Sequence, residues 1–216
     1  SSNANFTIDS TAPTGTISIN SGATYTNTTA VSLTFTVSET ISEIELRNGT
    51  TGSFQNPVPY VNPKSYTLPT GDGTKTVAVR FTDSAGNKST VAINDSIILD
   101  TTLPTDPTSI SSTSHTVSTP KADSTIDMTW NAGSDSLSGV DGYSYSFTNS
   151  ATSVPVASKM VEETVTSITS SVLSSGTWYF HLRTRDNAGS WTPTVHAGPF
   201  IIDTTPPTVD SPTITP

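Results

Sequence analysis

Residues 73–87 read GTKTVAVRFTDSAGN, and residues 176–190 read GTWYFHLRTRDNAGS. The glycine and the aspartate of this stretch keep the same separation in both copies, as Gly73 to Asp83 and as Gly176 to Asp186. An Asp-Thr-Thr sequence then follows at equal spacing, beginning at Asp100 in the first copy and repeating as DTT at 203–205 in the second. An internal repeat of this kind predicts two copies of one folding unit.

Each copy has the pattern of a strand, a tight turn and a returning strand. Val77, Val79 and Phe81 alternate with polar neighbours, as one buried face of a strand requires. In the DSAG and DNAG sequences, aspartate can accept from the next amides and glycine permits a positive φ. An apolar run, Val91 to Leu99 in the first copy, predicts the returning antiparallel strand, and the proline beyond it ends the ladder.

Short alternating apolar runs recur along the rest of the chain. About seven strands per 100 residues, with turn signals every 8–12 residues, is typical of a β-sandwich. The sequence therefore predicts an all-β fold of two tandem immunoglobulin-like or fibronectin type III-like β-sandwiches. The supporting runs are Val31 to Val37, Ile41 to Leu46, Tyr66 to Leu68, Ile126 to Trp130, Tyr143 to Phe147 and Val165 to Val172.

The composition agrees with strands and loops and excludes several classes of partner. Ser and Thr make up 76 of the 216 residues, and only 12% of the residues are charged. The net charge of −9 argues against nucleic acid, whose binding needs clustered Lys and Arg, and against anionic membranes. The chain has no cysteine, so neither thiol catalysis nor cysteine-ligated zinc is available. No apolar run is long enough for a spanning helix, which predicts no membrane insertion.

These motifs resemble two known kinds of module. Residues 14–100 are similar to bacterial Ig-like repeats that end in Asp-x-Ala-Gly-Asn and Asp-Thr-Thr-x-Pro. Residues 107–203 resemble bacterial fibronectin type III modules through Trp130, the SGVDGY sequence at 138–143 and the Gly176-Thr177 strand entry. The resemblance implies modules of an adhesin-type or secreted multidomain protein. It specifies fold more than function, because such modules serve many hosts.

The proline-containing junctions divide the chain. We expect an N-terminal linker at 1–13, an Ig-like sandwich at 14–100 and a short linker at 101–106. A fibronectin type III-like sandwich at 107–203 and a C-terminal linker at 204–216 complete the chain.

The positions of several carboxylates predict a metal site at one end of each module. In such a sandwich, the start of the first strand lies at the same end as the loop between the second and third strands and the loop between the sixth and seventh strands. Carboxylates in these three segments therefore come close together. Clustered carboxylates repel unless a cation or hydrogen bonds compensate, and Ca²⁺ takes 6–8 oxygen ligands. Calcium at inter-module linkers is also a property of similar adhesin repeats. The alternative is that Asp83 and Asp186 only cap their turns and the other carboxylates face solvent. The candidate calcium ligands are Asp9, Glu39 and Asp83 for the first module, and Asp100, Asp135, Asp141 and Asp186 for the second.

Exposed aromatic residues give a second candidate site. Trp191 follows a hairpin turn, and Tyr60 and Tyr66 lie in an irregular stretch rich in Pro and Asn. Such rings could form a stacking platform for a sugar. The alternative is that Trp191 covers the end of the sandwich, as large aromatic residues near loops usually do.

No catalytic constellation is apparent, so the sequence predicts that the chain is not an enzyme. His115, His181 and His196 form no close pair in the sequence, and alternation predicts His181 as a surface residue on the outer face of its strand. Nucleophile-elbow, phosphate-loop and metalloprotease motifs are missing.

The expected function is mechanical and spatial. We expect non-catalytic structural or adhesive spacer modules of a larger extracellular or cell-surface protein. Neighbouring domains of the same polypeptide are the expected partners, together with a surface protein or polysaccharide. The alternative is a carbohydrate-binding or accessory module attached to a secreted hydrolase.

Overall fold

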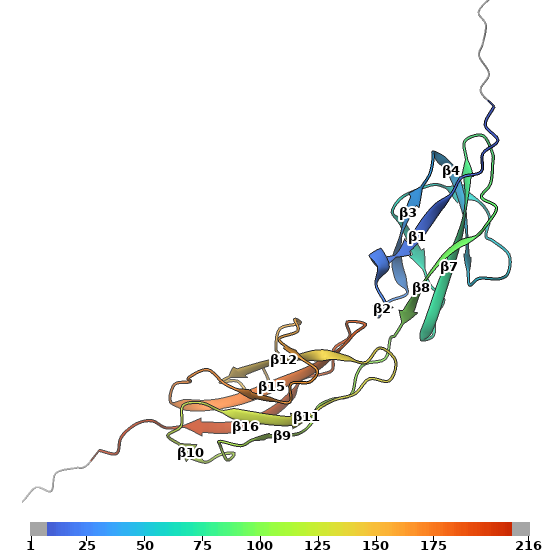
Figure 1. Cartoon of the computed structure of the whole chain (residues 1–216). Coiled ribbons are helices and arrows are strands. Elements are labelled where there is room, and N and C mark those ends of the chain that lie inside the picture. Colours follow the sequence, from blue (N-terminus) through green and yellow to red (C-terminus); the bar gives the residue numbers. More distant parts are fainter. Residues whose placement is uncertain (1–7, 209–216) are drawn as a thin grey trace, which may run out of the picture. The chain divides into compact units, whose positions relative to one another are not determined.

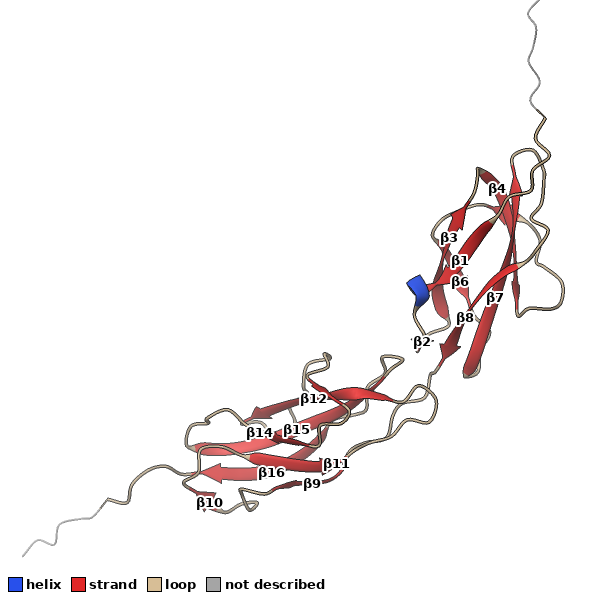
Figure 2. Ribbon diagram, in the orientation of Figure 1, coloured by secondary structure: helices blue, strands red, loops and turns tan. Residues whose placement is uncertain are grey.

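The computed structural model describes residues 8–208, so the predicted linkers at 1–13 and 204–216 lie partly outside the described residues. The chain divides into two compact units, Ser1–Thr102 and Leu103–Pro216. Figure 1 colours the first unit blue to green and the second yellow to red. Both units consist of paired β-sheets, and Figure 2 shows one short helical turn in the first unit. The prediction of two all-β sandwiches is confirmed.

The first unit packs a three-stranded sheet against a five-stranded sheet. The three-stranded sheet has the order β1-β3-β6, and the five-stranded sheet has the order β2-β8-β7-β4-β5. The strands are β1 (Gly15–Ile19), β2 (Tyr25–Thr26), β3 (Ala30–Val37), β4 (Ile41–Asn48), β5 (Val58–Pro59), β6 (Lys64–Thr67), β7 (Gly73–Asp83) and β8 (Ile93–Leu99).

The second unit repeats this topology strand for strand. Its three-stranded sheet has the order β14-β11-β9, and its five-stranded sheet has the order β10-β16-β15-β12-β13. The strands are β9 (Thr108–Ser112), β10 (Pro120–Lys121), β11 (Asp127–Asn131), β12 (Val140–Thr148), β13 (Val161–Glu162), β14 (Ser167–Thr169), β15 (Gly176–Asp186) and β16 (Val195–Ile202).

Each unit has its own hydrophobic core, formed by the alternating residues that face between its two sheets. Phe81 of β7 lies in the first core, and Phe180 of β15, which matches Val77 in the repeat, lies in the second. Both rings are fully buried. The fully buried side chains around them include Leu33, Ile44 and Val79 in the first unit and Met128, Tyr143 and Leu182 in the second.

The chain enters each unit through a strand that changes sheets. In the first unit β1 pairs antiparallel with β3, and the turn η1 (Asn20–Gly22) then redirects the chain. The following β2 pairs parallel with the end of β8, and Asp100 N donates to Thr26 O at 2.9 Å. In the second unit β10 pairs parallel with β16, and Asp203 N donates to Lys121 O at 2.8 Å. The second and last strands of both units are thus parallel neighbours.

Two predicted strands are shorter than the apolar runs that indicated them. The run from Val165 to Val172 contributes only β14, whose ladder with β11 ends at the pair Thr169 and Asp127. Val172 is consequently 78% exposed. The returning strand β8 begins at Ile93, and Val91 lies in the preceding turn.

The prediction that His181 is a surface residue is wrong. Alternation places His181 on the outer face of β15, but its side chain is fully buried. The β12–β13 loop, residues 149–160, folds onto this face, where Ser144 Oγ donates to Val156 O at 2.7 Å. His196 lies opposite His181 on β16, with 2.6 Å between the two Nδ1 atoms.

We expect the two cores to respond separately to truncation. Phe180→Ala should lower the free energy of unfolding of the second unit by about 3–5 kcal/mol, and Phe81→Ala should do the same in the first. Tryptophan fluorescence in a urea titration reports only the second unit, because all three tryptophans lie there (Trp130, Trp178 and Trp191).

The fluorescence midpoint should therefore fall for Phe180→Ala and stay unchanged for Phe81→Ala, whereas circular dichroism should detect both variants. A fluorescence midpoint that moved equally in both would contradict separate cores. Val91→Ala, an exposed substitution, is the control.

Candidate functional site

Asp83 lies at the end of β7, where it starts the turn to β8. Its side chain is only 3% exposed. Asp83 Oδ1 accepts from Ala85 N at 2.8 Å and from Asn87 N at 2.9 Å, and Oδ2 accepts from Asn87 Nδ2 at 2.9 Å. Gly86 completes this turn with a φ of 94°. The predicted capping of the turn by aspartate is therefore present.

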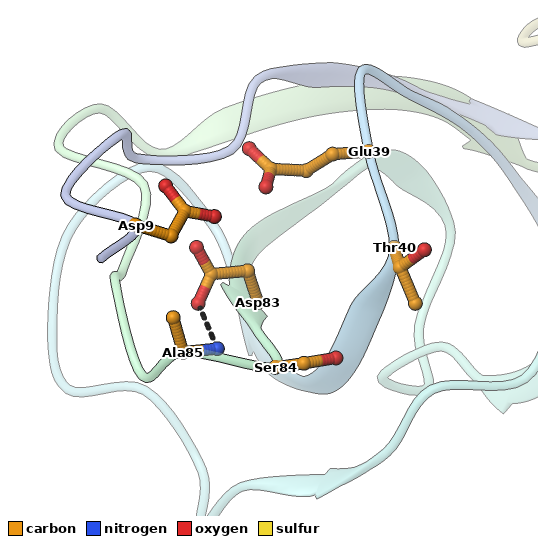
Figure 3. Close-up of a pocket in the computed structure, with 6 residues that line it drawn as sticks. All are labelled: Asp9, Glu39, Thr40, Asp83, Ser84 and Ala85. Carbon is orange, nitrogen blue, oxygen red and sulfur yellow. Dashed lines mark hydrogen bonds between the residues drawn. The ribbon is translucent and has the colours of Figure 1, made fainter. Parts of the chain in front are cut away.

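Two further carboxylates lie beside Asp83 in the first unit. Glu39 comes from the β3–β4 loop, and Asp9 comes from the segment before β1, which Asn87 Nδ2 contacts at Asp9 O (3.1 Å). Each of the three side chains offers one oxygen, and these oxygens lie within 4.8 Å of one another. Figure 3 shows the carboxylates facing one another across an open pocket of about 430 Å³.

The three carboxylates have different protonation equilibria. Burial acts to raise the pKa of Asp83, but the hydrogen bonds from Asn87, Ala85 and Gly86 outweigh it and lower the pKa. Burial raises the pKa of Glu39, and the charges of Asp9 and Asp83 raise it further. The ionised form of Glu39 is therefore opposed by its neighbours. A bound divalent cation would remove this repulsion, and carboxylate oxygens are the ligands that Ca²⁺ prefers.

The second unit repeats the turn around Asp186. This fully buried carboxylate lies at the end of β15, and its Oδ1 accepts from Ser190 N at 2.7 Å. An oxygen of Asp135 lies within 4.8 Å of an oxygen of Asp186. Asp135 Oδ1 accepts from Leu137 N, Ser138 N and Gly139 N at 2.8–3.0 Å. Burial acts to raise the pKa of Asp135, but these hydrogen bonds outweigh it and lower the pKa.

The remaining predicted ligands have other surroundings. Asp141 forms ion pairs with Lys159, at 2.9 Å, and with Arg185, so its charge is already compensated. Asp100 is fully buried in the first unit, directly after β8, and its Oδ1 accepts from Thr102 N at 3.1 Å.

Of the three aromatic candidates, Tyr60 and Tyr66 belong to the first unit and Trp191 to the second. Tyr60 and Tyr66 are half-buried and pack against the first core, and Tyr66 Oη donates to Asn48 Oδ1 at 2.9 Å. Burial raises the pKa of Tyr66. The Trp191 ring is covered by Arg183, whose Cζ lies 4.4 Å from the ring centroid.

Sequence reasoning missed two residues that organise the first unit. Asn87 reads as a turn residue, but its side chain connects Asp83 to the segment that carries Asp9. Asp72 reads as part of a polar turn, but its Oδ1 accepts from Thr101 N and Thr101 Oγ1 at 2.9 and 2.7 Å. These hydrogen bonds from Thr101, and one from Thr102, lower the pKa of Asp72. The Asp-Gly dipeptide at 72–73 is typical of a tight turn, so it was the sequence signal that could have identified Asp72 as a structured residue.

Comparisons with known proteins identify the fold. No protein-family model and no curated protein matches the chain. Among solved structures, the Clostridium thermocellum CbhA fibronectin(III)-like modules are 14% identical with a TM-score of 0.54, covering 87% of this chain and 95% of that chain. The FN1-FN3 domains of chicken CNTN1 are 15% identical with a TM-score of 0.50, covering 89% of this chain and 68% of that chain. The chain folds as a tandem of fibronectin III/Ig-like modules. The resemblance seen in the sequence is thus confirmed at the level of the fold.

The buried aspartate of the second module should be important for its stability. Asp186→Ala removes the acceptor of Ser190 N at a fully buried position, which we expect to lower the free energy of unfolding by about 1–3 kcal/mol. Tryptophan fluorescence in a urea titration measures this change. The control is Asp203→Ala, which removes an exposed acceptor of Thr205 N and should cost less than about 0.5 kcal/mol. Equal midpoints for the two variants would contradict the role assigned to Asp186.

Proposed function

We propose that the chain is a non-catalytic spacer segment that resists tension within a larger extracellular or cell-surface protein, and that its modules also serve adhesion. The observation that carries the proposal is the parallel pairing of the last strand of each module with its second strand, β8 with β2 and β16 with β10. Separate cores and a repeated topology support it, because such modules can be added in series without changing one another.

The parallel pairs matter because of how a pulling force reaches them. In the first module, once β1 has separated from β3, tension acts along β2 and leaves along β8, so the two neighbours are pulled in opposite directions along their length. Their hydrogen bonds, Ile98 N to Thr24 O at 3.0 Å and Asp100 N to Thr26 O at 2.9 Å, are then loaded together rather than one after another. The second module has the same arrangement, with Ser118 N donating to Pro199 O and Asp203 N donating to Lys121 O.

Catalysis has no support from the geometry of the described residues. Asp83 and Asp135 accept from turn amides, and the fold neighbours are fibronectin III-like modules and the FN1-FN3 domains of CNTN1. No helix within residues 8–208 has the length and apolar character needed to cross a membrane.

Single-molecule force spectroscopy tests the spacer proposal. Ile98→Pro removes the amide that donates to Thr24 O, so the first module should unfold at a clearly lower force than in the unmodified chain. The second module is an internal control, and its event is recognised by its longer unfolded contour length. An unchanged unfolding force for the first module would contradict the assigned role of the parallel pair.

We further propose that Ca²⁺ binds to Asp9, Glu39 and Asp83, and that Asp135 and Asp186 contribute to a second site. The participation of Asp100 stays a prediction from the sequence. Support comes from the three converging oxygens and from the raised pKa of Glu39. Because Asp9 precedes β1, a cation there would fix the entering segment to the β7–β8 turn.

Thermal unfolding with and without calcium tests the first site. Millimolar Ca²⁺ should raise the unfolding midpoint of the first module above its value in EDTA, because the ion binds only the folded state. Glu39→Gln should abolish this rise. In EDTA at pH 7 it should also raise the midpoint, since a carboxyl whose folded pKa is raised destabilises the fold when it is ionised.

Glu43→Gln is the matched control, since Glu43 is an exposed glutamate of the same region. Identical midpoints in EDTA and in Ca²⁺ would remove the calcium proposal and leave the spacer proposal intact.

The alternative of a carbohydrate-binding or accessory module of a secreted hydrolase stays a prediction. The positions of Tyr60, Tyr66 and Trp191 do not favour it, since these rings pack against a core or an arginine.

A further inference from the structure

Two histidines converge on the outer face of the five-stranded sheet in the second module. His181 of β15 and His196 of β16 are directly opposite in the antiparallel register. Their rings are nearly perpendicular, at 78°, with centroids 4.9 Å apart and Nδ1 atoms 2.6 Å apart. This pair lies outside the carboxylate sites and has no part in the spacer proposal.

Two nitrogen atoms at this distance require a hydrogen bond between them. If both Nδ1 atoms were unprotonated, their lone pairs would repel, and if both were protonated, the two hydrogens would collide. One proton must therefore lie between them, donated by one ring and accepted by the other. A position that holds a shared proton between two imidazole lone pairs is also one that a metal ion can take.

The contacts of His181 show which of its nitrogens carries the lone pair. Its Nε2 lies 2.9 Å from Thr148 Oγ1, and that hydroxyl donates its proton to Ser150 O at 3.0 Å. Thr148 must then accept from Nε2–H of His181, so the Nδ1 lone pair of His181 points toward His196. Imidazoles that bind metals are typically held this way, with the second ring nitrogen donating to a fixed acceptor.

The surroundings favour nitrogen-binding metals over calcium. Ser146 of β12 pairs with His181 on the side away from His196, so the three residues lie in one row across β12, β15 and β16. Arg183 is the nearest charged neighbour of His181 along β15. The Arg183 guanidinium stacks on the Trp191 ring, so it is directed at that ring. Tyr179 is the other ionisable neighbour on this face. Burial lowers the pKa of His181, and His196 lowers it further, so the ring is kept neutral as a metal ligand must be.

We propose that His181 and His196 form a binding site for a divalent transition metal ion of the zinc, nickel or copper class. Imidazole suits these ions, and water completes their coordination. His196 is exposed, so the ion reaches the pair from its side. The Nδ1 atoms must separate from 2.6 Å to about 3.3 Å, the spacing that Zn–N bonds of about 2.0 Å give in a tetrahedron. Rotation of the exposed His196 side chain permits this change. Binding displaces the shared proton, which moves to the Nε2 atom of the exposed His196, so that both rings stay neutral.

Calorimetric titration of the whole, tag-free chain with Zn²⁺ tests the site. Millimolar Ca²⁺ is kept in the buffer so that carboxylates do not compete for the added metal. We expect one ion per chain and a higher unfolding midpoint of the second module. His196→Gln should weaken binding at least about tenfold, because one of two ligands is lost.

His115→Gln is the matched control, because it removes the remaining histidine of the chain. Both nitrogens of His115 already have separate partners, Ser114 Oγ at 2.9 Å and Asp123 O at 3.2 Å, so Zn²⁺ affinity should be unchanged. An independent measurement uses Cu²⁺, which should broaden the imidazole NMR signals of His181 and His196 and spare those of His115. Failure to observe saturable Zn²⁺ binding, or equal affinity in His196→Gln, would overturn the proposal.

Discussion

The hydrogen bonds from turn amides to Asp83 and Asp186 fix the register of the last hairpin in each module. In both copies the amide four residues after the aspartate donates to its Oδ1, at 2.9 Å from Asn87 and 2.7 Å from Ser190. The returning strand can then align in only one way. This alignment places the end of β8 beside β2, and the end of β16 beside β10. It also places His196 opposite His181.

The same bonds explain why a buried carboxylate is tolerated at these positions. An ionised carboxylate without partners in a low-dielectric environment is strongly disfavoured, but several amide donors compensate it. Asp83 thereby stays ionised beside Glu39. The pKa of Glu39 is raised by burial, and the charge of Asp83 contributes to that rise. Structural capping and cation binding are therefore compatible roles of one side chain.

Most of the fold follows from local sequence patterns. Period-two alternation at Val77, Val79 and Phe81 gave the buried face of β7, and the Asp-x-Ala-Gly turn gave the hairpin. Grouping Asp9, Glu39 and Asp83 followed from the general arrangement of a sandwich, in which these three segments meet at one end. Whether calcium occupies that group remains a prediction.

What the sequence could not reveal depends on contacts between distant segments. Alternation assigned His181 to the correct face, but its burial depends on loop 149–160, whose path has no periodic signal. The two-residue strands β2 and β10 are too short to produce any alternation, although they make the parallel pairs. The contact of Asp72 with Thr101 likewise joins a turn to a segment that follows the last strand of its module.

The second module carries the two proposed kinds of metal ligand on one hairpin, and their chemistry keeps them separate. Oxygen ligands lie at the turn, where Asp186 is held by backbone amides, and nitrogen ligands lie in the middle of the strands. Calcium prefers carboxylate oxygens and has little affinity for imidazole, whereas zinc and copper accept imidazole readily. An ion at the Asp186 turn or at the histidine pair would cross-link β15 to another element. In both cases the ligand lies on β15, the strand that pairs with β16. Occupation of each site would therefore stabilise the strand that the parallel pair needs under tension, without one ion competing for the ligands of the other.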